Sequence, residues 1–368
     1  MNAVAWAQRG ITRYDESDRP ALDAFQRDMF GTDAHQLAPG HFQWLFEEVP
    51  TPDPEGMQFW ICKRNGAVVG QQGGIPFRLK VGTQLRGASW AIDLMVAPAW
   101  RLRGVGPALS ETHAAVSEVS VGLGISDAAH RAYKSAGWID LGGVPTYIRV
   151  IDPVQCVRVS HHDRALARAA ALAGRPVVTA ATMAFAGTAA ARGLRLSEVE
   201  RFDERVDALW PEASARFPVI AERSRDFLAW RFDRVPTAGR FRRFYLMQRG
   251  TPVGYLVLRQ ECWRGVPVGM VVDYLTKPGL SMAAFALLVE VARRDGMAAL
   301  ACRTLNPEIR KPLSMMGFLH KENGLNTPTR LMVRPGAAAQ DDAAVLADRR
   351  NWFVTAADSD AGFKELGG

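Results

Sequence analysis

Phe42-Gln43-Trp44-Leu45-Phe46, followed by Val49-Pro50, decides the architecture because the chain contains this block twice. The second copy is Phe227-Leu228-Ala229-Trp230-Arg231-Phe232, again followed by Val235-Pro236. Other matching segments keep the same order at offsets of about 180 to 188 residues: 13–16 with 201–204, 66–70 with 250–254, 92–94 with 272–274, and 135–138 with 314–318. A repeat of this length predicts two whole domains, not a solenoid.

The composition is that of a folded, globular protein. The 368 residues are 48% hydrophobic and 23% charged, and the net charge is +7, which fits two or three domains. The arginines are scattered and form no long basic run, so we expect no nucleic-acid partner. Four separate cysteines without a CxxC spacing predict reduced thiols, no metal site and a cytoplasmic location. The N-terminus lacks a secretory pattern, and no uncharged stretch reaches the ~18 residues of a transmembrane segment.

Composition and pattern divide the chain into four parts. We expect an N-terminal domain at 1–152, an alanine-rich helical connector at 153–198, the second copy at 199–334, and a spacer with a strand that docks back at 335–368. In each copy, antiparallel strands precede strand–helix–strand–helix–strand, which predicts an α+β fold with a mixed, mostly antiparallel sheet flanked by helices. The connector fits a buried or bridging helix pair, and the alternative is a membrane-surface segment.

A glycine-rich turn follows the predicted strand 91–96. It reads Arg101-Leu102-Arg103-Gly104-Val105-Gly106-Pro107 and precedes a predicted helix. The glycines allow the backbone to form a concave group of N–H donors, and the helix adds the positive end of its dipole, a combination that binds phosphate. The two arginines can pair with further phosphate oxygens. Two more features accompany the turn, Val96-Ala97-Pro98 before it and the segment from Tyr133 to Gly137-Trp138 after it.

With these residues the chain resembles the GNAT superfamily of acyl-CoA N-acyltransferases. The family pattern V-x-P-x-x-R-x-x-G-x-G/A is followed later by Y-x-x-x-G-F, and Trp138 takes the place of the final Phe. The resemblance covers about residues 10–150 and, more faintly, 199–333. It implies two tandem GNAT-like domains and acetyl-CoA, or another acyl-CoA, as co-substrate.

The resemblance also implies roles for single residues. Backbone groups of Leu94, Met95 and Val96 would pair with the pantetheine arm as an added strand would. N–H groups of the turn would hold the pyrophosphate, and these belong to Arg101, Leu102, Arg103, Gly104, Val105 and Gly106. Tyr133 would protonate the departing CoA thiolate. Many relatives have an Asn seven residues before this Tyr, where this chain has Ser126, so a hydroxyl would replace the amide contact to CoA.

The general base is less clearly marked. An amine acceptor is protonated at neutral pH and must lose a proton before it attacks. Asp93, on the strand before the turn, is our first candidate, and His130 is the second. Because the counterpart Asp273 survives in the second copy, a structural role for Asp93 is the alternative. We interpret Glu111 and His113 as solvated helix residues.

The second copy lacks the residues that carry this chemistry. Its turn, 275–282, has one glycine and no arginine, and Leu313 occupies the position of Tyr133. We therefore expect the first domain alone to bind acyl-CoA, and a chain ending near Val150 should still bind it. Trp44 and Trp230 are present in both copies, which indicates a packing role.

The expected activity is transfer of an acyl group, most simply acetyl, to an amine of a small molecule or amino sugar. One alternative is a non-catalytic acyl-CoA-binding or scaffold protein. Another is a peptidyl-type transferase that uses aminoacyl-tRNA. The sequence does not reveal the acceptor, the acyl chain length or the oligomeric state, because substrate pockets are built by variable loops.

Overall fold

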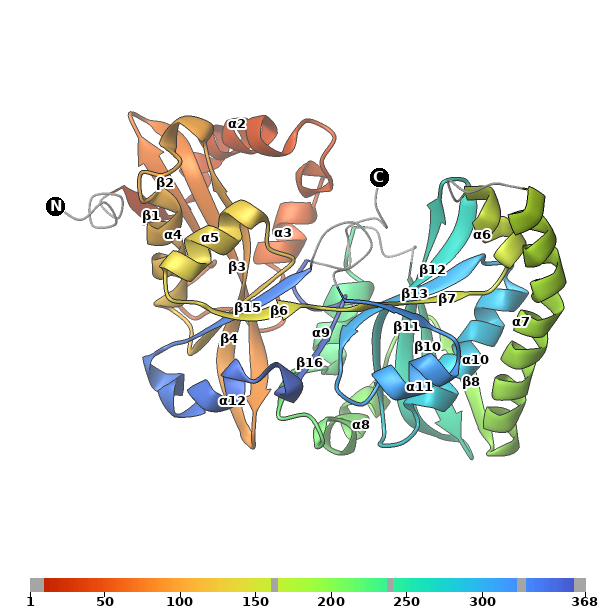
Figure 1. Cartoon of the computed structure of the whole chain (residues 1–368). Helices are drawn as coiled ribbons and strands as arrows, with labels where there is room; N and C mark the ends of the chain where they lie inside the picture. Colours follow the sequence, from red (N-terminus) through yellow and green to blue (C-terminus); the bar gives the residue numbers. More distant parts are fainter. Residues whose placement is uncertain (1–9, 160–164, 237–240, 323–328, 361–368) are drawn as a thin grey trace.

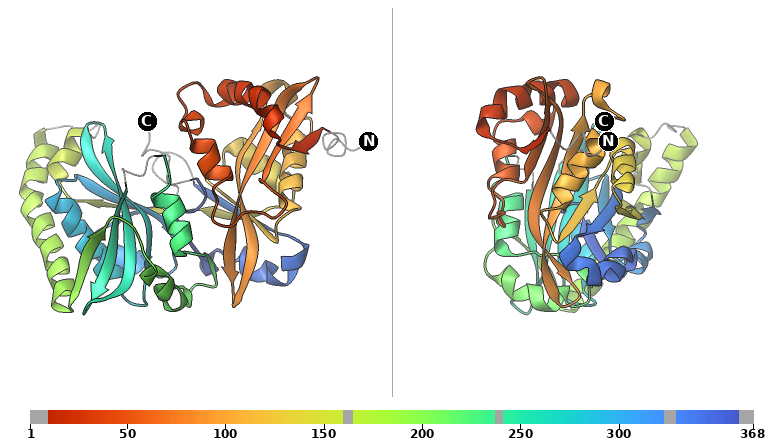
Figure 2. Two further views of the ribbon diagram at one scale, coloured as in Figure 1. Left: turned by 180° about the vertical axis from the view of Figure 1, so that it is seen from behind. Right: turned by 90° about the vertical axis from the view of Figure 1, so that its left-hand side faces the viewer.

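The computed structural model describes residues 10–159, 165–236, 241–322 and 329–360. Its strands join in one mixed sheet, flanked by helices and divided into two halves that lie side by side with α9 between them (Figures 1 and 2). Antiparallel pairs predominate, and the parallel pairs are β4 with β5, β12 with β13, and β16 with β9. This is the predicted α+β class.

The first half starts with a short strand and two helices and then forms three long antiparallel strands. Asn65 and Gly66, both with positive φ (51° and 79°), make the tight turn between the first two of these long strands. Its elements are β1 (Ile11–Arg13), η1 (Glu16–Asp18), α2 (Arg19–Phe30), η2 (His35–Leu37), α3 (His41–Phe46), β2 (Phe59–Arg64), β3 (Ala67–Val81), β4 (Gln84–Val96), η3 (Pro98–Trp100), α4 (Val105–Ala114), β5 (Val119–Leu123), α5 (Asp127–Ser135), β6 (Ile139–Gly143) and β7 (Thr146–Val150).

The second half repeats this order after a helical connector. One short strand, β9, is added between its first two helices. The connector is α6 (Pro153–Val159) and α7 (Ala165–Ala191), and the second half is β8 (Leu194–Val199), α8 (Arg205–Ser214), β9 (Val219–Ala221), α9 (Arg225–Phe232), β10 (Phe241–Gln248), β11 (Thr251–Trp263), β12 (Val266–Thr276), α10 (Ser281–Arg294), β13 (Ala299–Leu305), α11 (Arg310–Met315), β14 (Leu319–Lys321) and β15 (Arg330–Pro335).

Both halves contain the same irregularity in the same strand pair. Opposite β3, strand β4 carries one extra residue near Asp93, so the register shifts between Gln71 and Gly73. Opposite β11, strand β12 carries one extra residue beside Asp273. A β-bulge bends the strand that carries it and re-aims the side chains there. The shared bulge supports the repeat seen in the sequence.

The last strand of each half lies in the sheet of the other half. β7 pairs with β13 and β14 of the second half, and β15 pairs with β5 and β6 of the first half. The proposed boundaries at 152 and 334 mark the ends of the two sequence repeats. They do not mark the ends of the two halves of the sheet, because each half contains one strand from the other repeat. A chain ending near Val150 would lack β15, a strand that pairs with β5 and β6, and CoA binding by such a fragment stays a prediction.

The repeated tryptophans meet at the contact between the halves. Trp44 on α3 and Trp230 on α9 stack with ring centroids 5.0 Å apart. Each indole Nε1 donates to the other residue's carbonyl oxygen at 2.8 Å. Their role is packing, as expected, but they pack across the halves and not inside each one.

The C-terminal segment inserts between the halves. After η5 (Ala337–Asp342), α12 (Ala343–Ala347) and η6 (Arg349–Asn351), strand β16 (Trp352–Thr355) pairs with β9 on one side and β13 on the other. Since β9 also pairs with β3 of the first half, the chain end links the two halves of the sheet. Trp352, Phe353 and Val354 are buried there.

Candidate active site

A gap opens in the first half where β4 and β5 separate. The two strands pair from Ala88 to Trp90 on β4 and then diverge. Asp93 lies just beyond, in a left-handed conformation (φ 52°) at the bulge. Within the described chain, no strand pairs with this edge of β4 beyond Trp90. Leu94, Met95 and Val96 are consequently only partly buried, and this edge can accept an extended ligand as an added strand.

The glycine-rich turn lies at the end of this gap. Leu102 and Gly104 both have positive φ (60° and 81°), and they alternate with Arg103. Such alternation turns successive N–H groups toward one concave face. Helix α4 begins at Val105, and its first-turn N–H groups, including that of Gly106, have no intrahelical partner. A turn of this geometry can bind an anion.

The side chains of the turn are directed to solvent. Arg101 donates from Nε to the Val96 carbonyl at 3.1 Å, and the guanidinium of Arg103 lies 5.4 Å from the Trp100 ring. Both arginines and Leu102 are exposed. A Cβ added at Gly106 would lie 3.5 Å from Ala132 Cβ of α5, an ordinary van der Waals distance.

Tyr133 lies beside the gap, on α5. Its ring stacks on Trp138 at 4.4 Å, and its hydroxyl donates to Gln72 Oε1 at 3.2 Å. Burial raises the pKa of Tyr133, the Gln72 hydrogen bond lowers it, and the charge of Asp93 raises it again. The phenol therefore keeps its proton at neutral pH, as a general acid requires. Ser126 caps α5, and its Oγ accepts from the Ala129 N–H at 3.3 Å.

The candidate bases have different surroundings. Asp93 is half-buried and close enough to Tyr133 to affect its pKa. His130 is bonded to another carboxylate, and its Nε2 lies 2.7 Å from Asp140 Oδ2. His113 is fully buried, so our interpretation of it as a solvated residue was wrong. Its Nε2 lies 2.9 Å from Ser89 Oγ, and burial lowers the pKa of His113 to about 3.

Sequence analysis missed two glutamines that organise this region. Gln71 and Gln72 are fully buried on β3, opposite the bulge. Gln72 receives the Tyr133 hydroxyl and donates to the Ile92 carbonyl at 2.7 Å, and Gln71 donates to the Asp93 carbonyl at 3.4 Å. The sequence signal for this network was the pair of adjacent amide side chains within the apolar first part of the strand, because buried polar groups need hydrogen-bond partners.

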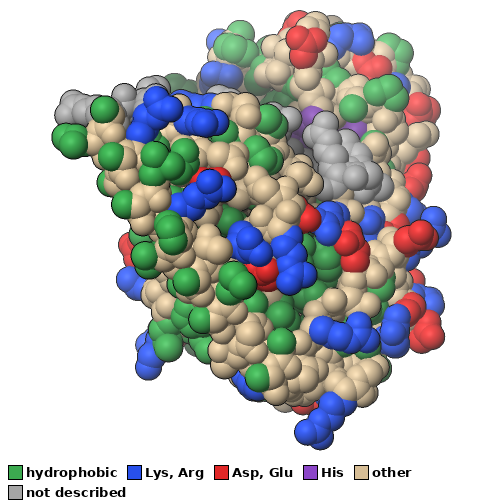
Figure 3. All heavy atoms as spheres, turned by 90° about the vertical axis from the view of Figure 1, so that its right-hand side faces the viewer, with side chains coloured by type: hydrophobic (Ala, Val, Ile, Leu, Met, Phe, Trp, Pro, Cys, Tyr) green, Lys and Arg blue, Asp and Glu red, His purple; other side chains and the backbone are tan. Residues whose placement is uncertain are grey.

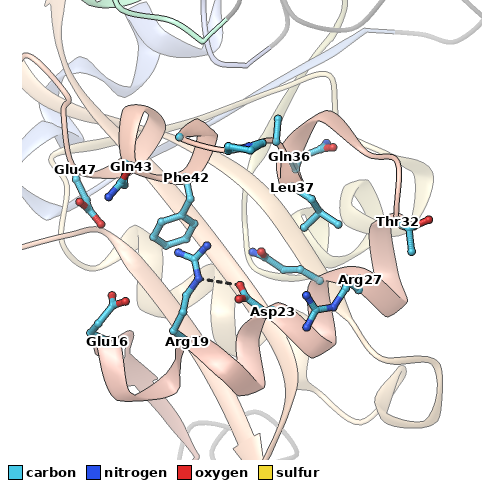
Figure 4. A pocket seen from close by; sticks show the side chains of 14 residues that line it. Glu16, Arg19, Asp23, Arg27, Thr32, Gln36, Leu37, Phe42, Gln43 and Glu47 are labelled. Atoms are coloured by element: carbon cyan, nitrogen blue, oxygen red, sulfur yellow. Dashed lines mark hydrogen bonds and ion pairs between the residues drawn. The ribbon is translucent and has the colours of Figure 1, made fainter.

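A polar pocket of about 740 Å³ adjoins this network. It lies between α2 and α3 and is lined in part by Glu16, Arg19, Asp23, Arg27 and Glu47 (Figure 4). Arg19 pairs with Asp23 at 2.8 Å beneath the Phe42 ring. Gln26, also in the wall, donates to Gln71 Oε1 at 3.1 Å. Two hydrogen bonds thus connect the pocket to the bulge at Asp93.

The corresponding gap in the second half is filled. There β12 and β13 pair from Val268 to Val271 and then separate. Strand β16 occupies the space, with Thr355 opposite Thr304 of β13. Its Thr355 Oγ1 donates to Asp273 Oδ1 at 2.8 Å. The residues from Asp273 to Thr276, which match 93–96, are all buried.

A buried ion pair holds this segment in place. Arg223 contacts Asp273 at 3.1 Å and Asp358 at 2.8 Å, and all three side chains are almost completely buried. Tyr255 donates its hydroxyl to Asp273 at 2.8 Å. Asp273, the counterpart of Asp93, therefore has a structural role in the second half.

The remaining parts of the second site also differ. Four residues separate Thr276 from the first residue of α10 at Ser281, against eight between Val96 and Val105. Gly279 is the one left-handed residue of that shorter turn (φ 74°). Leu313, at the Tyr133 position, is buried. Among the described residues, no group of three or more His, Cys, Asp or Glu side chains could hold a metal ion.

Comparison with known proteins identifies the fold. The chain matches no protein-family model and no curated protein sequence. Solved structures do match. One is a GCN5-related N-acetyltransferase from Anabaena variabilis, with 14% identity and a TM-score of 0.60 over 88% of this chain and 72% of that one. A probable N-acyltransferase from Enterococcus faecalis has 10% identity and a TM-score of 0.60 over 89% and 72%.

A third match, a GCN5-related N-acetyltransferase from Kribbella flavida, has 13% identity and a TM-score of 0.56 over 88% of this chain and 70% of that one. Each match covers most of this chain, so the likeness extends over both halves. The chain therefore has the fold of the GNAT superfamily.

Proposed function

We propose that this protein is an acyl-CoA-dependent N-acyltransferase whose active site lies in the first half. The observation that carries the proposal is the open gap between β4 and β5, which ends at an anion-binding turn. An extended, hydrogen-bonding arm with a diphosphate at its end matches this combination, because the strand edge offers backbone partners and the turn offers N–H donors. Acetyl-CoA is the simplest such co-substrate.

Tyr133 would act as the general acid. A proton must reach the sulfur when the thioester breaks, and the phenol holds its proton at neutral pH because burial raises its pKa. Its hydroxyl would break its hydrogen bond to Gln72 Oε1 and donate to the leaving thiolate instead. Gln72 would keep the ring in place, since its amide nitrogen stays bonded to the Ile92 carbonyl.

The acceptor would enter through the polar pocket between α2 and α3. The pocket presents the carboxylates of Glu16 and Glu47 beside the Arg19–Asp23 ion pair and Arg27. Its carboxylates would attract an ammonium group, and its mixed polar wall would hydrogen-bond the hydroxyls of an amino sugar. Gln26 and Gln71 connect the pocket wall to the backbone carbonyl of Asp93, and the carboxylate of Asp93 would take up the proton of the amine directly or through water. The pocket size fits a small-molecule acceptor.

The filled gap of the second half supports a single active site. β16 lies where a second acyl-CoA would have to bind, and the short turn lacks the alternating left-handed residues. A non-catalytic acyl-CoA-binding protein would also need the open gap and the turn, but it would not need a protonated phenol such as that of Tyr133 beside them. A cytoplasmic location, where the four free cysteines stay reduced, goes with this proposal.

Two measurements test the proposal with the full chain. Isothermal titration with acetyl-CoA should give one site per chain, and release of free thiol should depend on an added amine from a panel of amino sugars and small amines. Binding without amine-dependent thiol release would favour the scaffold alternative. A lack of acyl-CoA binding together with binding of aminoacyl-tRNA would favour the peptidyl-type transferase.

A further inference from the structure

Helix α7 presents an uncovered apolar face at the outer end of the molecule. It lies at the far end from the first half (Figures 1 and 2). Its inner side contacts α10, α6 and β8, and its buried residues are Ala171, Thr182, Ala186 and Ala189. The large apolar residues elsewhere on the helix are exposed: Leu166 by 84%, Leu172 by 59%, Val177 by 70% and Met183 by 55%. They are four of the nine large hydrophobic residues that are exposed in the described chain.

The helix is rich in alanine and has no acidic residue among its 27 residues. Its charged residues are Arg168 and Arg175, both exposed. By length and composition, α7 is the one helix of the described chain that could cross a membrane. Only 17% of its most apolar 18-residue segment is buried in the protein. To cross a membrane, α7 would have to lose its contacts with α10. The geometry therefore favours a helix that lies along the membrane surface.

Positive charge surrounds this face. The described residues of 153–198 include five arginines (158, 168, 175, 192 and 195) and one acidic residue, Glu198. Arg175 pairs with Asp152 at 3.4 Å and remains 58% exposed. Hydrophobic side chains cover much of the left of this side of the molecule, with basic side chains among and above them (Figure 3).

We propose that the α7 face binds the surface of an anionic lipid bilayer. The apolar residues would enter the boundary between headgroups and acyl chains, and the arginines beside them would contact lipid phosphates. A second copy of the chain fits less well. A symmetric dimer through α7 would bring the same basic surface of two chains together, and like charges repel at such a contact.

This surface is independent of the proposed transferase site. The turn at Gly104 belongs to the first half, remote from α7 (Figure 1), so a bound membrane would leave it open to solution. Docking would hold the protein at the bilayer while its gap stays accessible.

Vesicle flotation with the full chain tests the proposal. The protein should float with vesicles of phosphatidylcholine and phosphatidylglycerol, and raised salt should weaken binding because it screens the arginines. Val177→Glu together with Met183→Glu should reduce the bound fraction by about tenfold or more, since each change removes a buried apolar contact with the lipid. Both positions are exposed, so the thermal melt should stay unchanged.

The matched control is Met315→Glu with Leu319→Glu, which adds the same charge at exposed apolar positions (60% and 64%) outside α7. This variant should float like the wild type. Equal binding to pure phosphatidylcholine, or no binding to either vesicle, would overturn the proposal. A dimer in light scattering that the α7 variant dissolves would assign the face to a second copy instead.

Discussion

The gap between β4 and β5 and the gap between β12 and β13 are built from the same elements, but one is open and the other is closed. In the first half, residues 93–96 are half-buried and lie beyond the part of β4 that pairs with β5. In the second half, 273–276 is buried under β16, which the chain supplies from its own end. The bulge is present in both. The difference teaches that the bulged strand pair belongs to the fold, while the proposed acyl-CoA binding depends on the gap being open.

Tyr133→Phe should produce the largest difference between the halves. It removes one hydroxyl and keeps the ring on Trp138, so turnover should fall by roughly 10²–10⁴-fold with little change in acetyl-CoA affinity. Because Leu313 occupies the Tyr133 position, Tyr274→Phe serves as the control in the second half; it removes a buried hydroxyl that bonds Thr304 and Asn306. Steady-state kinetics should show near-normal turnover for that variant. A loss below tenfold for Tyr133→Phe would remove this residue from the proton transfer.

Trp44→Ala and Trp230→Ala test whether the two halves contribute equally to the contact between them. Each removes one member of a stacked, reciprocally hydrogen-bonded pair, so each should lower the free energy of unfolding by roughly 3–5 kcal/mol. Urea unfolding of the double variant should show less than the sum, because both changes delete the same contact. Strictly additive effects would mean that each indole stabilises its own half.

Gly104→Asp and Gly279→Asp compare the two turns. Both glycines are left-handed (φ 81° and 74°), so both changes carry a similar backbone cost of roughly 1 kcal/mol. Only the first places a carboxylate beside the proposed pyrophosphate site, and titration should show about a 100-fold weaker acetyl-CoA affinity for it alone. Comparable weakening by Gly279→Asp would show that the second half takes part in binding.

Acid should destabilise the first half through His113. Its pKa in the folded protein is about 3, against 6.5 for the free side chain, so the unfolded chain takes up a proton that the folded chain excludes as pH falls below 6.5. The stabilisation is complete above that pH and decreases by about 2 kcal/mol at pH 5. His113→Leu should abolish this part of the pH dependence in urea unfolding at pH 7 and pH 5. An unchanged dependence would show that His113 contributes nothing to it.

Local patterns made much of this molecule predictable from the sequence. The turn at Asn65-Gly66 and the strand–turn–helix around Gly104 depend on neighbouring residues, and the repeat is visible when the sequence is compared with itself. The structure contains all three. The roles given to Tyr133, Asp93 and the turn residues stay predictions, although the structure brings them to one gap. The burial of His113 was missed because a helix pattern alone does not tell which face α4 turns to the sheet.

Long-range features could not be predicted in the same way. The strand exchange leaves no local mark, because 146–150 and 330–335 have apolar patterns that suit either sheet equally. The insertion of β16 depends on pairing between 352–355 and strands up to about 130 residues away. The polar pocket depends on how α2 and α3 sit above β3, which no single segment encodes.

The exchanged strand β15 also sets the timing of folding during synthesis. The first half needs residues 330–335 between β5 and β6 to complete its sheet, yet they are made about 200 residues after β5. At roughly 5–20 residues per second, the ribosome needs about 10–40 s to deliver them. Many proteins finish their N-terminal domain before the next one is made, but here the first half must wait with two strand edges unpaired. The edges of β5 and β6 are therefore the places where a nascent chain would recruit a chaperone or pair with a neighbour.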